Sequence, residues 1–509
     1  MDWFDFSLKP AHRTASYYNP QVKVKVAPDG TLNRRVRGTY GGNVTDYTGL
    51  RASWTADMQT VKLLLNATVS EDANLCSLDL KDFYLGSKLE HDEYMWLTRK
   101  QVPQEILDRY GSRIIWSGDK TMVRIAKGLY GLPQAGRVAH EKLAVLLAKH
   151  DHLPTSTPCL FKHVINGLYF TLVVDDRNRS SLEHLFASIR EEYEFEVDEA
   201  ATKYIGMTLT YDRPGRTITL SMPGYVQAAL KRFGVTLDSK LTHCPAKFEP
   251  ILYGQKVQYA TSDDSPMVSE SQTTFIREVI GVFLYYARAV DPTMIHTLSK
   301  LSLGQGTPTM ATYNAVLHFL QYAATYPNAA IRYHPSDMCL ILWSDASYLS
   351  ESNARSRVGG VHYLSNHGNP TDVPPNGAID VISTIIPTVV SSAGEAELAG
   401  HFLNGQHGMA TRTTLADLGY VQLATPIITD NTTAKGIADQ SVRLKRSKAI
   451  DMRYFWIQDR VKQGHYGIHW GPGASNLADY FTKSHPIRTY LEKRSIFLEP
   501  SLSQATTVS

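Results

Sequence analysis

This sequence contains two groups of carboxylates that could each bind divalent cations, and the first group stands where strands are expected to end. In the first group, Asp79 closes the apolar stretch LCSLDL, and Asp175 and Asp176 close the stretch LYFTLVV. Nucleotidyl transfer needs two cations about 3.5–4 Å apart, which grip the attacking hydroxyl and the leaving phosphate. Two adjacent aspartates facing a third on a neighbouring strand meet that need, and Mg²⁺ suits such a site. The alternative is a plain hairpin turn, which an isolated VVDD indicates more often.

The second group contains four acids from four expected elements. Asp345 lies in the strand-like LWSDASYLSE, Glu397 in the helical SSAGEAELAGHF, Asp430 at the end of PIITD, and Asp479 in NLADYFTK. Any one of them alone is more often a helix cap or a surface charge. Together they could converge on two cations for phosphodiester hydrolysis, although spacing alone does not prove that they meet.

The elements around these acids fall into three parts. Short strands mix with helices up to about residue 250. The second part, 251–335, is largely helical, with apolar residues at helical spacing in IREVIGVFLYYARAV. The third part, 336–490, opens with CLILWSDAS and alternates strands with helices, which favours a mixed α/β sheet; a tail covers 491–509.

Composition narrows the class of protein. With 43% hydrophobic and 20% charged residues, the chain is typical of globular proteins, and its net charge of +3 permits nucleic-acid binding without arguing for it. The four cysteines include no CxxC pair, which argues against a structural zinc site and favours reduced thiols. Neither a signal peptide nor a membrane-spanning stretch is recognisable. We therefore expect an intracellular protein, in a cytoplasmic particle or the nucleus, with no membrane partner.

Several motifs resemble one family in order. LDLKDFYLGSKLEHDEYMWL, GLYGLPQAGRVAHEKL, VVDD and TKYIGMTLTYDRPGRTITLSMPGYVQAALKRFG resemble the reverse transcriptase of copia-type LTR retrotransposon polyproteins, and the likeness continues into a ribonuclease H. The resemblance covers nearly the whole chain. It implies a multidomain α+β and α/β fold: right-hand polymerase fingers and palm over 1–250, a helical thumb or connection over 251–335, and a ribonuclease H-like mixed-sheet domain over 336–490.

The resemblance also assigns roles in the polymerase. Asp79, Asp175 and Asp176 would hold two Mg²⁺, with Mn²⁺ as the alternative cation. Tyr84 would crowd the sugar 2′ position and reject ribonucleotides, whereas its plain interpretation is a core tyrosine. Gln134 would lie against the incoming nucleotide, whereas its plain interpretation is a loop residue.

A basic strand precedes these motifs. Within NRRVRGTYGG, Arg35 and Arg37 alternate onto one strand face, so both could reach one ligand. Guanidinium groups suit phosphate oxygens. The resemblance implies that they grip the dNTP triphosphate; a solvated edge strand is the alternative.

In the ribonuclease H, the resemblance implies a second two-cation site. The acids that fill the family's order are Asp345, Glu397, Asp430 and Asp479. Glu395 competes with Glu397, which we prefer because the family's acid directly precedes the stretch that reads LAG here. A basic run next to aromatic residues would bind the hybrid duplex, with a solvated helix edge as the alternative. The run comprises Arg443, Lys445, Arg446 and Lys448.

The predicted function is therefore RNA-directed DNA synthesis with ribonuclease H activity, on an RNA template, a DNA primer and the RNA–DNA hybrid. Two features depart from the family. The residues after Asp176 read RNRSS and lead straight into a helix, so the returning strand of the aspartate hairpin looks shortened or missing. We therefore expect impaired polymerase activity, since metal sites tolerate only small errors in geometry. No protease or integrase region precedes the polymerase, which indicates a truncated genomic copy.

Two other functions compete. A degenerate copy would bind nucleic acid without polymerase activity. A host protein reusing the fold for protein contacts would show a large exposed apolar patch, and the intact second group of acids argues against it.

Overall fold

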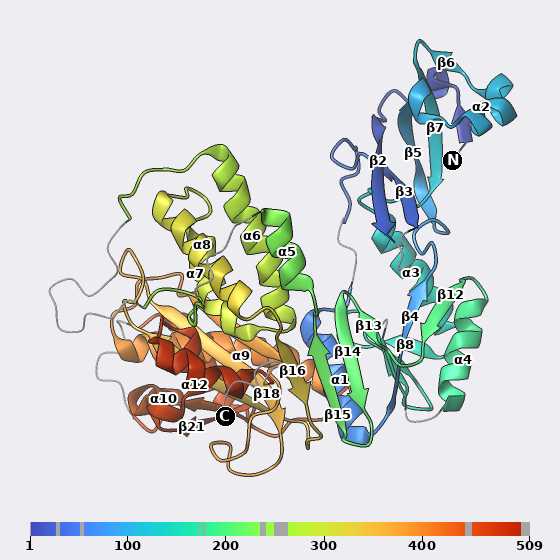
Figure 1. Cartoon of the computed structure of the whole chain (residues 1–509). Coiled ribbons are helices and arrows are strands. Elements are labelled where there is room, and N and C mark those ends of the chain that lie inside the picture. Colours follow the sequence, from blue (N-terminus) through green and yellow to red (C-terminus); the bar gives the residue numbers. More distant parts are fainter. Residues whose placement is uncertain are drawn as a thin grey trace. The chain divides into compact units, whose positions relative to one another are not determined.

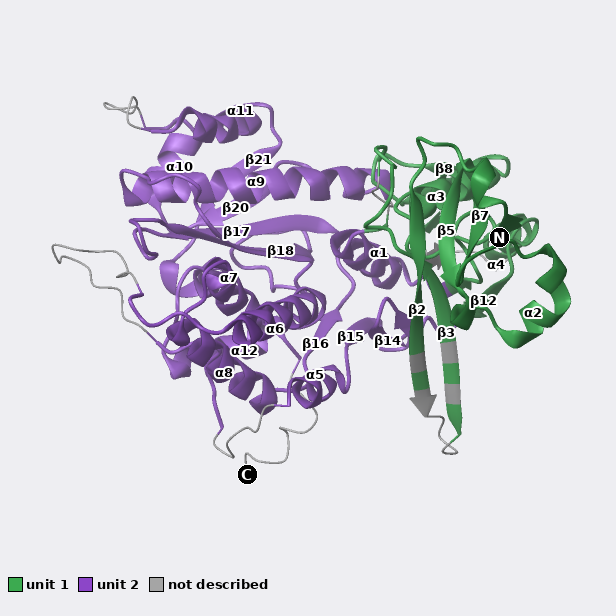
Figure 2. Cartoon of the chain, turned by 90° about the horizontal axis from the view of Figure 1, so that it is seen from above, with its two compact units in different colours: residues 1–56, 78–172, 179–197 green, residues 57–77, 173–178, 198–509 purple. Residues whose placement is uncertain are grey.

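The computed structural model describes residues 2–26, 31–50, 55–171, 173–176, 179–234, 241–248, 263–442 and 450–499. It forms two compact units. The first comprises residues 1–56, 78–172 and 179–197, and the second comprises residues 57–77, 173–178 and 198–509 (Figure 2). Among the described residues, none of the helices combines the length and apolar character that crossing a bilayer requires.

The first unit contains a sheet in the order β1-β7-β5-β2-β3, with β6 beside β7 (Figure 1). Its strands are β1 (Asp2–Phe4), β2 (Ala15–Val26), β3 (Leu32–Tyr40), β5 (Lys88–Thr98), β6 (Trp116–Ser117) and β7 (Lys120–Lys127). Buried side chains from alternate strand positions, including Met95, Val123 and Ile125, form its core. The short helix α2 (Gln104–Tyr110) follows β5 in the chain.

The rest of the first unit is a short meander with two helices. Strands β8 (His152–Pro154), β9 (Phe161–His163) and β10 (Tyr169–Phe170) pair antiparallel in that order. Helices α3 (Ala135–Ala148) and α4 (Arg179–Arg190) contact each other, and β12 (Phe195–Asp198) follows α4. Helix α3 buries Ala139, Leu143 and Leu147, one face at helical spacing.

The second unit begins with α1 (Met58–Glu71) and the start of β4 (Asn74–Leu80), which pairs with β11 (Val173–Asp176). A four-stranded antiparallel sheet follows. Its strands, in spatial order, are β13 (Lys203–Tyr204), β14 (Met207–Asp212), β15 (Thr217–Ser221) and β16 (Ala330–Tyr333). Within the described residues between β15 and β16, four α-helices pack on one another (Figure 1). They are α5 (Tyr225–Phe233), α6 (Glu270–Ala289), α7 (Ile295–Gly304) and α8 (Met310–Thr325).

A five-stranded mixed sheet forms the rest of the second unit, in the order β19-β18-β17-β20-β21. Its strands are β17 (Cys339–Ser347), β18 (Arg357–Ser365), β19 (Asp380–Ile385), β20 (Thr425–Thr429) and β21 (Tyr466–Trp470). The first three pair antiparallel, and β20 and β21 run parallel to β17. The long helix α9 (Ala393–Asp417) packs on β17 and β18. This is the mixed class of sheet predicted for the region.

Three shorter helices complete the second unit: α10 (Thr432–Ala438), α11 (Trp456–Lys462) and α12 (Ile487–Phe497). Residues 491–497, at the start of the predicted tail, lie within α12. The guanidinium of Arg494 on this helix contacts Asp291 and Tyr322, which belong to the helical segment between β15 and β16. The C-terminal helix is therefore fastened to residues much earlier in the chain.

Candidate metal centre

Three carboxylates of the second unit converge. Asp345 lies on β17, Glu397 on α9 and Asp430 directly after β20, and one oxygen from each lies within 4.8 Å of the other two. Strands β17 and β20 are neighbouring parallel strands, with Trp343 paired with Ile428. Two residues further along each strand are Asp345 and Asp430, so the parallel register brings them to the same edge of the sheet.

A fourth acid, Asp479, lies in the short 3₁₀ helix η8 (Leu477–Phe481). The hydroxyl of Thr482 bridges it to the trio: it lies 2.8 Å from Oδ2 of Asp345 and 3.0 Å from the main-chain oxygen of Asp479. The buried Asn476 caps η8 and donates a hydrogen bond of 3.2 Å to the main-chain oxygen of Ser344. These contacts hold η8 against β17.

Burial and the closeness of the acids together raise the pKa values of two of them. Burial, followed by the charge of Asp479, raises the pKa of Asp345 to about 7. Burial, followed by the charges of Asp345 and Asp430, raises the pKa of Glu397 well above its usual value. Like charges in so dry a place destabilise one another unless a cation joins them.

The unused hydrogen-bonding capacity of Glu397 fits a divalent cation. Its Oε1 accepts a bond of 3.3 Å from the backbone amide of Ala346, while Oε2 is buried without a hydrogen-bond partner among the described residues. A buried oxygen without a partner costs about 1–3 kcal/mol. Carboxylate oxygens are the ligands that hard divalent cations prefer, so the trio offers a suitable donor set.

Glycines allow the elements around the acids to approach closely. A Cβ on Gly359 would lie 2.5 Å from the main-chain oxygen of Ala478, and one on Gly360 would overlap the side chain of Asn404. Both glycines lie on β18, where Gly359 pairs with Asp345. A Cβ on Gly473 would lie 2.7 Å from Oδ2 of Asp430. The close packing of η8 and α9 against β18, and of Gly473 against Asp430, thus requires side chains to be absent at these positions.

The structure separates the two competing glutamates of α9. Glu395 accepts bonds of 2.6 and 2.8 Å from the backbone and hydroxyl of Ser391, and a third of 3.0 Å from the backbone of Asp451. Its carboxylate is therefore occupied in fixing the start of α9. Glu397 belongs to the acidic trio instead.

The first group of predicted acids is described only in part. Asp79 is exposed on β4, while the side chains of Asp175 and Asp176 lie outside the described residues. Their backbone pairs antiparallel with Leu75 and Asn74, so neither aspartate is paired with Asp79. Strand β11 ends at Asp176 and α4 begins at Arg179, and the two residues between them lie outside the described part of the chain.

The predicted nucleotide contacts in the first unit have protein partners. Tyr84 is half-buried, packs on the unit's core and meets Tyr130 edge to face, with 5.6 Å between ring centroids. Gln134 is 5% exposed, and its Nε2 donates a bond of 2.8 Å to Glu93. Glu93 also forms an ion pair of 2.9 Å with Arg13. Gln134 and Arg13 line a small pocket of this unit.

The predicted basic contacts are partly described. The backbones of Arg35 and Arg37 lie on β3, and the exposed Arg37 guanidinium stacks over Tyr130 at 4.5 Å from its ring centroid. The side chain of Arg35 lies outside the described residues, as does the whole basic run proposed for the hybrid. That run comprises Arg443, Lys445, Arg446 and Lys448.

Sequence reasoning missed some residues that support the acids. Thr482 and Lys483 belong to the same NLADYFTK motif as Asp479, and Nζ of Lys483 lies 2.5 Å from Oδ1 of that aspartate. The available signals were a hydroxyl three residues and an ammonium group four residues after an acid near a helix start.

The chain was compared with known proteins. Residues 36–251 match the family described as reverse transcriptase (RNA-dependent DNA polymerase). The retrovirus-related Pol polyprotein from transposon TNT 1-94 of Nicotiana tabacum is 24% identical over 440 residues, which cover 84% of this chain and 31% of the relative. The Transposon Ty1-BL Gag-Pol polyprotein of Saccharomyces cerevisiae is 20% identical over 488 residues, covering 91% and 26%. The chain thus spans less than a third of each relative.

Solved structures with some likeness include the prototype foamy virus protease–reverse transcriptase. It is 11% identical with a TM-score of 0.21, covering 92% of this chain and 53% of that chain. The N-terminal RNase H domain of Mycobacterium tuberculosis rv2228c is 12% identical with a TM-score of 0.21, covering 31% and 96%. By the matched family and the two polyproteins, the chain is similar to the reverse-transcriptase region of a copia-type Pol polyprotein.

Proposed function

We propose that the chain is a retrotransposon RNA-directed DNA polymerase with ribonuclease H activity, and that the ribonuclease is its better-supported half. The observation that carries the proposal is the convergence of Asp345, Glu397 and Asp430 within 4.8 Å. Cleavage of a phosphodiester by paired cations needs such a cluster of oxygen ligands. Its substrate would be the RNA strand of an RNA–DNA hybrid, recognised through duplex shape and 2′-hydroxyl groups.

Each acid has a role in this proposal. The trio and Asp479 would hold two Mg²⁺, with Mn²⁺ as the alternative. When bound, the cations activate water and stabilise the charge that develops on the phosphate. Thr482 would orient the Asp345 carboxylate through its 2.8 Å hydrogen bond, and Lys483 would do the same for Asp479 through their ion pair.

The polymerase half of the proposal keeps Asp79, Asp175 and Asp176 as cation ligands. Arg35 and Arg37 would bind the dNTP triphosphate, Tyr84 would exclude ribonucleotides, and Gln134 would contact the nucleotide. Each of these roles is assigned from the position of the residue in the reverse-transcriptase motifs, and so rests on the match to that family. Gln134 would have to exchange its bond to Glu93 for one to the nucleotide.

We further propose that DNA synthesis is impaired. Only two residues separate β11 from α4, so the aspartate pair lacks the second hairpin strand that would support it. An error of about 1 Å in a catalytic group can cost roughly a hundredfold in rate. The alternative is a degenerate copy that binds nucleic acid without any catalysis. It predicts that the chain neither synthesises DNA nor cleaves the RNA–DNA hybrid.

The proposal also includes domain boundaries, nucleic-acid contacts and a location in the cell. The polymerase would span residues 1–250, the thumb or connection 251–335, the ribonuclease 336–490 and a tail 491–509. The basic run over 443–448 would bind the hybrid, alongside the RNA template and DNA primer in the polymerase. We expect the chain to act inside the cell, in a cytoplasmic particle or the nucleus.

Two assays on the purified chain test the proposal. Hydrolysis of a labelled RNA–DNA hybrid should require Mg²⁺ or Mn²⁺ and should vanish in Asp345→Asn. Primer extension on an RNA template should be weak and should vanish in Asp175→Asn. Binding of the hybrid without its cleavage would support the degenerate copy and would overturn the proposed ribonuclease activity. Vigorous Mg²⁺-dependent synthesis would overturn the claim of an impaired polymerase.

A further inference from the structure

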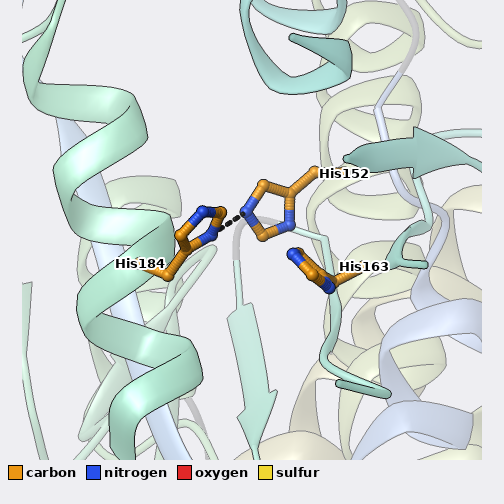
Figure 3. A group of neighbouring side chains, drawn as sticks. All are labelled: His152, His163 and His184. Atoms are coloured by element: carbon orange, nitrogen blue, oxygen red, sulfur yellow. Dashed lines mark hydrogen bonds between the residues drawn. The ribbon is translucent and has the colours of Figure 1, made fainter. Parts of the chain in front are cut away.

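Three histidines of the first unit form a group that the proposed function does not use. His152 lies on β8, His163 on β9 and His184 on α4, and one ring nitrogen from each lies within 4.8 Å of the other two. Figure 3 shows the rings turned toward one another, with Nδ1 of His184 only 3.3 Å from Nε2 of His152. Ring centroids are 4.7 to 5.3 Å apart.

The spacing suits a tetrahedral cation. Zinc binds imidazole nitrogens at about 2.0–2.1 Å, which puts two ligand nitrogens of a tetrahedral site roughly 3.3 Å apart. The nitrogens of His152 and His184 already lie at that separation. Imidazole is a preferred ligand of zinc and of other late first-row metals, whereas the oxygen ligands of the carboxylate trio suit Mg²⁺.

Burial keeps two of the rings neutral. Burial, followed by the charges of the neighbouring histidines, lowers the pKa of His152 to about 3, and burial, followed by His184, also lowers the pKa of His163. Neutral imidazole is the form that binds a metal.

The backbone orients the third ring. Amide nitrogens of Ile165 and Asn166 lie 3.2 and 3.3 Å from Nδ1 of His163, which turns Nε2 of that ring toward the group (Figure 3). With Nδ1 accepting these bonds, the proton of His163 resides on Nε2. A cation that binds Nε2 therefore requires this proton to move to Nδ1, which ends the two amide contacts. Because His184 is exposed, solvent can reach the group.

We propose that His152, His163 and His184 bind one Zn²⁺, or a similar late first-row divalent cation, with solvent completing a four-coordinate site. The cation joins the β8–β9 hairpin to α4. Such a link would hold α4 against the hairpin and stabilise this part of the first unit.

Titration of the full chain with Co²⁺, followed by visible absorption, tests the proposal. Tetrahedral nitrogen ligation should give an intense band that saturates at one equivalent and disappears when Zn²⁺ is added. Octahedral Co²⁺ on the carboxylate trio would absorb only weakly. The band should be lost in His184→Gln, retained with an altered spectrum in His184→Cys, and unchanged in the exposed control His91→Gln.

Absence of the band in the parent chain, or its persistence in His184→Gln, would overturn the site. X-ray absorption spectroscopy of the zinc-loaded parent chain identifies the atoms that coordinate the zinc, and this measurement needs no variant. Three imidazole ligands around zinc would support the proposal, and a shell of oxygen ligands alone would refute it. The group would then be a set of packed, neutral histidines.

Discussion

The Thr482 hydroxyl and the Asp345 carboxylate lie 2.8 Å apart, and both side chains are buried. A hydrogen bond to a buried charged group contributes about 1.5–3 kcal/mol. We therefore expect Thr482→Val, which preserves the shape of the side chain, to lower kcat for hybrid cleavage at least about tenfold. KM should change little, and Thr482→Ser should restore the rate. Equal kcat in the parent and Thr482→Val would show that this bond does not position Asp345.

The glutamates of α9 should respond oppositely to loss of charge. Glu397→Gln removes one member of a crowded, buried acidic trio, so without metal we expect a gain of about 1 kcal/mol in stability and no hybrid cleavage. Glu395→Gln weakens the bonds from Ser391 and Asp451 and should lower stability. Thermal unfolding in a chelator, alongside the cleavage assay, measures both effects. A loss of stability in Glu397→Gln would contradict the proposed repulsion.

Stability should depend on pH through His407 and Asp380, which lie 3.0 Å apart. Burial alone would raise the pKa of Asp380, but the hydrogen bond from His407 and the charges of His362, His407 and Lys62 lower it to about 2. The same bond raises the pKa of His407. Asp380 therefore adds stability that is lost as pH falls toward 2. His407 adds stability that is lost as pH rises through its raised pKa.

The pair should consequently stabilise the fold most between about pH 4 and pH 6.5. His407 is half exposed, so we expect His407→Gln to cost about 0.5–1 kcal/mol near pH 5 and almost nothing near pH 8.5. Melting temperatures of the parent and variant at the two pH values provide the measurement. An equal loss at both would mean that His407 contributes through packing and not through charge.

Gly473 should matter because of the acid beside it. A Cβ in Gly473→Ala would lie 2.7 Å from Oδ2 of Asp430, so the carboxylate must move. A displacement of about 1 Å at a catalytic group costs roughly a hundredfold, which is the expected fall in cleavage. Gly306→Ala is the matched control, since nothing lies within 4 Å of the added atom. Similar rates in both variants would remove Asp430 from the mechanism.

Two acids of the centre could be predicted because they follow apolar, strand-like stretches. Asp345 and Asp430 follow apolar stretches, and parallel pairing of β17 with β20 brings them together. The choice of Glu397 over Glu395 came from a family motif, and the physical reason appears only in the fold, where Ser391 and Asp451 occupy Glu395. Cation-binding roles for all these acids stay predictions.

Contacts between distant segments could not be predicted in the same way. Gln134 bonds to Glu93, and the two come from a helix start and a strand that no motif connects. The three histidines likewise come from two strands and a helix, with no spacing typical of a metal site. The absence of CxxC pairs carried no information about imidazole ligands.

Contacts of Arg494 and Arg357 determine which segments a shortened copy of the chain could lose and still fold. Arg494 on the last helix contacts the fully buried Asp291, and the fully buried Arg357 on β18 donates a bond of 2.8 Å to Ser299 on α7. Breaking a buried ion pair costs about 3–5 kcal/mol. A fragment starting at residue 336 would lose both partners and should not remain folded. If the chain has the proposed ribonuclease activity, selection for that activity alone would also preserve Asp291 and helix α7, whatever becomes of DNA synthesis.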